Sequence, residues 1–134
     1  MFWNKKKDEE AKYVLLLALN CELNDIKKWN EETFPDATLG GQLEKVEEDF
    51  NEFFNAKEVE DQRKELADVF IVLGGLRRWG SKIGNNQEIS LTEQMPVEIL
   101  GNLLIDIHNK MEINRKRVWK KSGNGKFHHE EVKK

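Results

Sequence analysis

Hydrophobic residues recur at helical spacing in four segments of the chain, and short clusters of turn-forming residues separate them. The first predicted helix covers residues 8–29 and ends before Phe34-Pro35-Asp36, and Thr38 is positioned as the N-cap of the next. The other three predicted helices cover residues 39–54, 59–79 and 96–117. Residues 80–90 are predicted to form a loop, and residues 122–134 an irregular tail. The pattern predicts an all-α, four-helix fold that occupies residues 1–134 as one domain.

The composition agrees with long amphipathic helices. The 134 residues are 38% hydrophobic and 35% charged, with a mean hydropathy of −0.74, and nine glycines and two prolines are too few for an all-β sandwich. The longest apolar run, Val14–Leu19, is too short to span a bilayer and follows acidic residues. We therefore expect a cytoplasmic protein without a membrane segment. The single cysteine, Cys21, is expected to be a small buried residue in a reducing compartment.

Charge is distributed unevenly, although the net charge is only −3. Residues 44–68 contain ten acidic and four basic residues, whereas residues 115–134 contain eight basic and two acidic ones. The net charge does not favour nucleic acid as a partner. The distribution predicts that the acidic block binds cations and that the basic end binds phosphates.

Two acidic couples stand out within the acidic block. Asp49 with Glu52, and Glu65 with Asp68, are each three residues apart and therefore lie on one face of a helix. In an antiparallel hairpin that turns near residues 57–59, Glu52 lies opposite Glu65, and Asp49 lies opposite Asp68. The pattern therefore predicts four carboxylates in one patch, bordered by Glu48.

Asp68 is the one polar side chain between residues 66 and 76, so it is expected to be buried. Two like charges 4 Å apart repel by about 4 kcal/mol at an effective dielectric constant of 20, and Mg²⁺ would neutralise such a cluster. A solvated acidic face, or a lysine or arginine partner for Asp68, is the structural alternative. No Glu precedes His108, His128 or His129 by three residues, which argues against a di-iron bundle.

The same residues carry a family resemblance. The segment 45–52 (KVEEDFNE) followed by 65–68 (ELAD) resembles the EExxE…ExxD signature of MazG-like all-α nucleoside triphosphate pyrophosphohydrolases. Asp49 stands where that family usually has Glu. The resemblance extends upstream to Trp29 and Phe34. It also extends downstream over a Lys…Asn…Arg…Trp…His ending, formed here by Lys110, Asn114, Arg115, Arg117, Trp119 and His128.

The resemblance implies hydrolysis of a nucleoside or deoxynucleoside triphosphate to the monophosphate and pyrophosphate. It implies Mg²⁺, with Mn²⁺ as a substitute, and a homodimer or homotetramer. The implied catalytic residues are Glu48, Asp49, Glu52, Glu65 and Asp68, and the last four are the implied metal ligands. The implied substrate-binding residues are Lys110, Asn114, Arg115 and Arg117, which with Asp106 form a polar stripe on the last predicted helix.

Two other functions are compatible with the pattern. The first is a non-catalytic helical dimerisation module whose basic end contacts nucleic acid. The second is a related enzyme that acts on another diphosphate-linked substrate. Trp29, Phe34 and Trp119 are suited to stacking on a base, but packing in the core is the commoner role of such residues. No Gly-x-x-x-x-Gly-Lys-Ser/Thr sequence is present, which rules out a P-loop NTPase.

Overall fold

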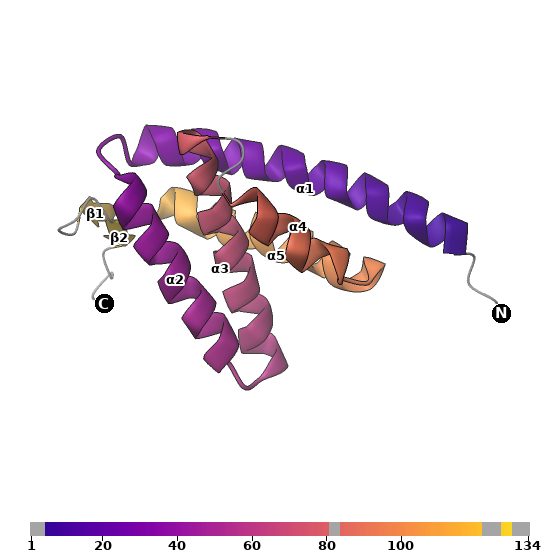
Figure 1. Ribbon diagram of the computed structural model, residues 1–134. Coiled ribbons are helices and arrows are strands. Elements are labelled where there is room, and N and C mark those ends of the chain that lie inside the picture. Colours follow the sequence, from indigo (N-terminus) through magenta and orange to yellow (C-terminus); the bar gives the residue numbers. More distant parts are fainter. Residues whose placement is uncertain (1–4, 81–83, 122–126, 130–134) are drawn as a thin grey trace.

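The computed structural model describes residues 5–80, 84–121 and 127–129, and it confirms the all-α fold class (Figure 1). The helices are α1 (Lys5–Thr33), α2 (Leu39–Asn55), α3 (Val59–Leu76), the 3-10 turn η1 (Arg77–Trp79), α4 (Asn85–Glu93) and α5 (Val97–Lys116), and the strands are β1 (Trp119–Lys121) and β2 (Phe127–His129).

Helix α3 lies at the centre of the molecule and packs against α1, α2 and α5. Because it has neighbours on three sides, its second half is buried all round, as the apolar run predicts. One core cluster joins α3 to α1 and α5 through Leu23, Phe70 and Ile107. A second cluster joins α3 to α2, with Val69 and Leu73 at its centre. The α2–α3 hairpin therefore has an apolar seam, and the acidic residues of both helices lie beside it.

The chain turns sharply between α1 and α2, and local hydrogen bonds fix this turn. The Thr38 side chain accepts a hydrogen bond from the backbone N–H of Gly41 at 3.0 Å, which confirms Thr38 as the N-cap of α2. Helix α2 then runs antiparallel to α3. In Figure 1 the two form a hairpin that projects from the long helix α1.

Helix α4 corrects the prediction of a loop over residues 80–90. Gly84, which precedes it, adopts the left-handed conformation with φ +80°, and the helix then buries two polar residues, Glu88 and Thr92. Glu88 forms a two-bond ion pair with Arg77, at 2.9 and 3.2 Å. Leu91 of α4 packs against both core clusters, whereas Ile89 is exposed, so the apolar residues of α4 form too short a pattern to have revealed the helix.

The predicted irregular tail is also corrected in part. Trp119–Lys121 and Phe127–His129 form an antiparallel ribbon in which Trp119 pairs with His129 and Lys120 with His128. The rest of the predicted tail, residues 122–126 and 130–134, lies outside the described residues. The Trp119 ring packs edge-to-face against Phe34 and Trp29, with ring centroids 5.1 and 5.9 Å away. This contact joins the ribbon to the turn between α1 and α2. These rings therefore pack against one another, which is the commoner of the two roles considered for them.

Several apolar side chains remain on the surface. Cys21 is exposed, which corrects the expectation that it is buried, because the buried face of α1 is formed by Leu19, Leu23 and Ile26 instead. Tyr13 and Leu17 of α1, which fit the predicted apolar spacing, are also exposed. In the described residues, no helix combines the length and the apolar character needed to cross a membrane.

Candidate active site

The α2–α3 hairpin brings the four predicted carboxylates together. Asp49 and Glu52 come from α2, and Glu65 and Asp68 come from α3. The negative charges of the four act on one another, and these interactions contribute to the raised pKa values of Asp49, Glu65 and Asp68. The antiparallel arrangement and the i, i+3 spacing of each couple account for this convergence. Glu48, the fifth predicted acid, is about half exposed and lies beside Lys45, with 3.9 Å between Lys45 Nζ and Glu48 Oε2.

Asp49 is the most deeply buried of these acids. Only 3% of its surface is exposed, whereas the Asp68 side chain is 24% exposed. The sequence led us to expect Asp68 as the buried carboxylate, and the structure corrects this. The pKa of Asp49 is raised to about 6, chiefly by burial and also by the charges of Asp68 and Glu52, while Lys45 lowers it.

Glu65, like Asp49, has a strongly raised pKa. Burial, a carboxyl–carboxyl hydrogen bond with Glu52 and the charges of the other three acids raise its pKa to about 7. That hydrogen bond requires a proton on one of the two carboxyl groups. The Oε2 oxygen of Glu65 is buried and has no hydrogen-bond partner among the described residues. Glu65 therefore has an oxygen available for a cation or a donor that the chain itself does not provide.

Two lysines, one from α2 and one from α5, contact the cluster. Lys45 Nζ lies 3.6 Å from Asp49 Oδ1, and Lys110 Nζ of α5 lies 3.6 Å from Asp68 Oδ1. Burial raises the pKa of Asp68 above its ordinary value, while the charges of Lys110 and Lys45 lower it. A basic partner for Asp68 was the structural alternative to a metal ion, and the structure contains one. Even with both lysines in place, the pKa values of Asp49 and Glu65 are above their ordinary values.

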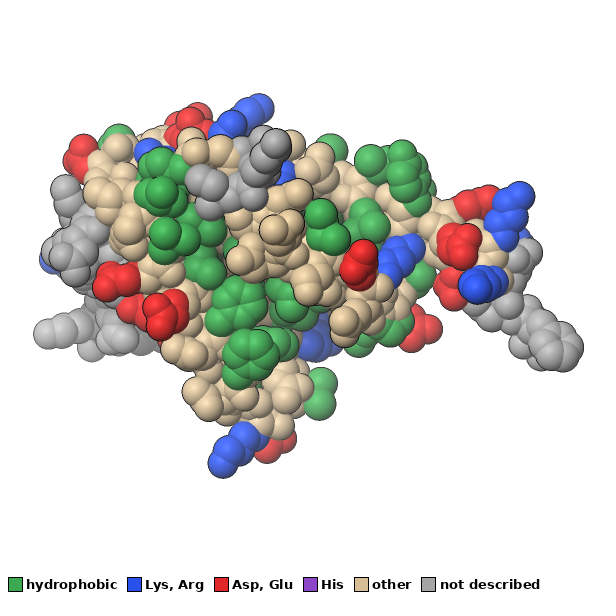
Figure 2. Space-filling model, in the orientation of Figure 1, with side chains coloured by type: hydrophobic (Ala, Val, Ile, Leu, Met, Phe, Trp, Pro, Cys, Tyr) green, Lys and Arg blue, Asp and Glu red, His purple; other side chains and the backbone are tan. Residues whose placement is uncertain are grey.

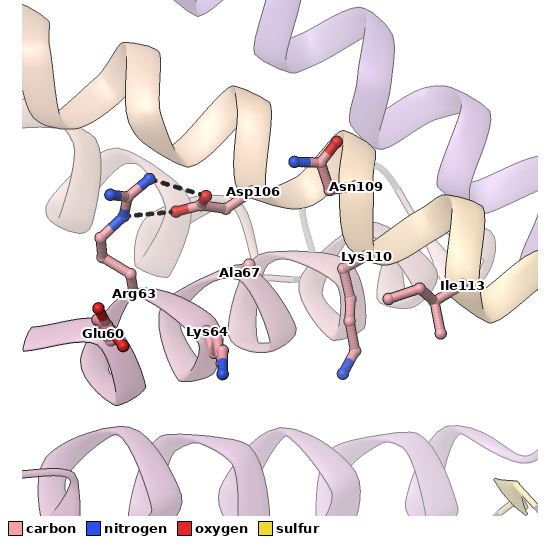
Figure 3. A pocket seen from close by; sticks show the side chains of 8 residues that line it. All are labelled: Glu60, Arg63, Lys64, Ala67, Asp106, Asn109, Lys110 and Ile113. Carbon is pink, nitrogen blue, oxygen red and sulfur yellow. Dashed lines mark hydrogen bonds and ion pairs between the residues drawn. The ribbon is translucent and has the colours of Figure 1, made fainter. Parts of the chain in front are cut away.

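A groove of about 570 Å³ lies between α3 and α5, next to this cluster (Figure 3). The side chains of Lys64 and Lys110 extend to the same side of it, while Arg63 turns towards Asp106. The Arg63 guanidinium and the Asp106 carboxylate form two parallel hydrogen bonds of 2.9 Å. This fork links the two helices at one end of the groove. The residues that line the groove are Glu60, Arg63, Lys64, Ala67, Asp106, Asn109, Lys110 and Ile113.

The predicted substrate-binding residues of α5 do not form one stripe. Lys110 lines the groove, whereas Asn114 is buried at the end of the helix. The Asn114 side-chain oxygen accepts a hydrogen bond from Arg117 at 3.1 Å, and its backbone oxygen accepts one from the Trp119 indole at 3.1 Å. Arg115 lies on the exposed surface of α5. Lys110 is therefore the predicted phosphate-binding residue that borders the carboxylate cluster, whereas Asn114 joins α5 to the ribbon through Trp119.

The donor atoms of the cluster are those that Mg²⁺ and Mn²⁺ prefer. Four carboxylates supply hard oxygen ligands, and the partnerless Oε2 of Glu65 fits a cation. In the described part of the chain, no group of three or more His, Cys, Asp or Glu residues is already arranged to hold a metal ion. Two of the four carboxylates are instead turned to lysine ammonium groups.

Two contributors to the site were missed at the level of sequence. Lys45 precedes Asp49 by four residues, a spacing that places both side chains on one helical face and that could have indicated the ion pair. Arg63 pairs with Asp106 across 43 positions of the chain, for which the sequence contains no local signal. Models of protein families, curated proteins and solved structures were all compared with the chain, and none of them matches it.

Proposed function

We propose that this protein is a divalent-metal-dependent nucleoside triphosphate pyrophosphohydrolase of the MazG-like kind. One observation carries the proposal. Four carboxylates from two antiparallel helices share one patch, and the pKa values of Asp49 and Glu65 stay raised although two lysines are present. Strongly perturbed pKa values cluster at functional sites, and in this cluster the acids outnumber the two lysines.

Asp49, Glu52, Glu65 and Asp68 are the residues that would hold the metal. A bound Mg²⁺ or Mn²⁺ would polarise the substrate phosphates and lower the pKa of a bound water molecule. The chain's own contribution is to place these acids beside the groove between α3 and α5. Lys110 borders both features, so its ammonium group is positioned to contact a polyphosphate. Glu48, at the exposed edge of the cluster, is the remaining candidate catalytic residue.

A nucleotide panel tests this function. Purified protein is incubated with nucleoside and deoxynucleoside triphosphates and Mg²⁺ or Mn²⁺, and pyrophosphate and orthophosphate are measured separately. We expect pyrophosphate and the monophosphate from at least one substrate. Loss of an outer-shell partner of a metal ligand costs about 10–100-fold, so Glu52→Gln and Glu65→Gln should each lower turnover by about 100-fold or more. The control is Glu47→Gln, an exposed acid of the same helix. Orthophosphate as the sole first product, or no turnover at all, would contradict the proposal.

The exposed apolar side chains support a homo-oligomer as the active form. Tyr13, Val14 and Leu17 are at least half exposed on α1, and Phe54 and Val59 are about 70% exposed at the tip of the hairpin. Figure 2 shows hydrophobic side chains over the α2–α3 hairpin and along α1. Surfaces of this kind commonly bind another protein chain. We expect a dimer or tetramer by light scattering at micromolar concentration, and a monomer would contradict this part of the proposal.

The same surface also favours the second candidate, a non-catalytic dimerisation module with a basic C-terminal end. That function predicts binding of duplex DNA or RNA that depends on residues 115–126 and weakens steeply with salt. It further predicts no hydrolysis in the nucleotide panel. A gel-shift titration at two salt concentrations, run beside the panel, separates the two functions.

A further inference from the structure

The two lysines of the carboxylate cluster come from different helices and reach the same set of acids. Lys45 of α2 is paired with Asp49, and its charge also acts on Asp68. Lys110 of α5 is paired with Asp68. Both lysine side chains are about one-third exposed, so each has open space beside it as well as a carboxylate partner. The ammonium groups therefore lie between the acids and the solvent.

These ion pairs are of a kind that can exchange. Each joins a flexible lysine to one aspartate oxygen at 3.6 Å, and the further contact of Lys45, with Glu48, is longer still at 3.9 Å. The neighbouring Arg63–Asp106 pair differs, because two parallel hydrogen bonds of 2.9 Å fix it. A planar guanidinium in such a fork is suited to a permanent link between helices. A lysine held by contacts of 3.6 Å or more is suited to leaving when a stronger cation arrives.

A divalent cation would compete for the same oxygens. Mg²⁺ binds carboxylate oxygens at about 2.0–2.1 Å, a distance at which it would repel an ammonium group that faces the same oxygen. With one proton shared between Glu52 and Glu65, three carboxylates face two ammonium groups, so the cluster remains negative while the lysines are in place. One divalent ion would supply the positive charge that both lysines together supply in this structure.

We propose that Lys45 and Lys110 are internal cations, which hold Asp49 and Asp68 in the metal-free protein and are displaced from them when a divalent metal ion binds. This inference rests on the metal site of the proposed function. Once displaced from Asp68, the Lys110 ammonium group would lie in the groove between α3 and α5, where it would be accessible to a polyphosphate. Lys45 acts as a positioning residue, because it holds Asp49 in place without itself being a metal ligand.

The test is a calorimetric titration of the metal-free protein with MnCl₂ at about pH 8, where carboxylates with moderately raised pKa values are ionised. Lys45→Met removes the competing charge and keeps much of the side-chain volume. We expect this variant to bind Mn²⁺ about tenfold more tightly than the wild type, because a charge that repels the metal has been removed. Lys110→Met should change the affinity in the same direction. Lys45→Arg, which keeps the charge, should bind no more tightly than the wild type.

Lys57→Met is the matched control, since it removes the same charge from the exposed turn between α2 and α3 and should leave the affinity unchanged. If the wild type binds Mn²⁺ and neither methionine variant binds it more tightly, the displacement is wrong and the metal site stands. If no form of the protein binds Mn²⁺, the proposed metal site fails and the displacement fails with it. Circular dichroism of each variant establishes that it is folded, and Lys110→Met provides the answer should Lys45→Met not fold.

Discussion

Asp49→Asn is the substitution that most directly tests how the buried Asp49 carboxylate affects the stability of the fold. The Asp49 pKa rises from 3.8 in the unfolded chain to about 6 in the folded protein. A raised pKa means that the folded state favours the protonated form. The stability this group contributes is therefore fully present below pH 3.8 and is lost as the pH rises through about 6. Above that range the folded protein retains an ionised carboxylate in a site that disfavours it.

The size of the effect follows from the shift. A change of about two pKa units corresponds to about 3 kcal/mol at 1.36 kcal/mol per unit, and Asp49 is only 3% exposed, so solvent screens little of it. Asparagine has nearly the same shape and no charge. In the absence of metal we expect Asp49→Asn to be more stable than the wild type by up to about 3 kcal/mol at about pH 8. The difference should shrink towards zero near pH 4.

Urea unfolding at several pH values, followed by circular dichroism, measures this difference. Glu47→Gln is the control, because it removes one negative charge from the exposed face of the same helix and should change the stability by no more than about 0.5 kcal/mol. An Asp49→Asn variant that is equal to or less stable than the wild type at about pH 8 would refute the reasoning. Such a result would mean that the Lys45 ion pair outweighs the cost of burying the charge.

Two further predictions concern packing. Arg77→Met leaves Glu88 buried without its partner, so we expect a loss of about 3 kcal/mol in the free energy of unfolding and faster amide exchange in α4, measured by hydrogen exchange. An unchanged exchange rate in α4 would show that the ion pair does not attach this helix. A Cβ at Gly75 would lie 2.6 Å from the side-chain amide nitrogen of Asn30, so Gly75→Ala should lower the free energy of unfolding by about 1–3 kcal/mol. A Cβ at Gly101 would meet open space, so Gly101→Ala should raise it by about 0.5–1 kcal/mol. Thermal unfolding of both variants checks the opposite signs.

The parts of the fold that the sequence predicted are those held by apolar periodicity. Leu100, Leu103, Ile107 and Met111 are all buried in α5, as their spacing indicated. The bounds of α2, α3 and α5 were predicted to within three residues. Helix α4 could not be predicted in this way, because beside the packing of Leu91 its position depends on an ion pair and buried polar side chains, which have no hydrophobic period.

The candidate site was likewise predicted in part. The facing of Glu52 with Glu65, and of Asp49 with Asp68, follows from hairpin symmetry, which the spacing of the acids revealed. Which of them is buried could not be read from α3 alone. Asp68 precedes an apolar run but lies towards the partly exposed Lys110, and Asp49 is covered although its own helix is rich in charges. Burial in a helical hairpin depends on what the neighbouring helix covers, and that is a property of the tertiary structure.

The contact of Trp119 with Trp29 and Phe34 has a consequence for how the molecule comes apart. It joins the segment after the last helix to the end of the first, so α2 to α5 lie within one loop of the chain that this aromatic cluster closes. Closing a loop of that length carries an entropic cost that local helical contacts do not. Once the loop is closed, however, α1 cannot separate from the ribbon without breaking the cluster, which couples the two ends of the helical domain in a single cooperative transition.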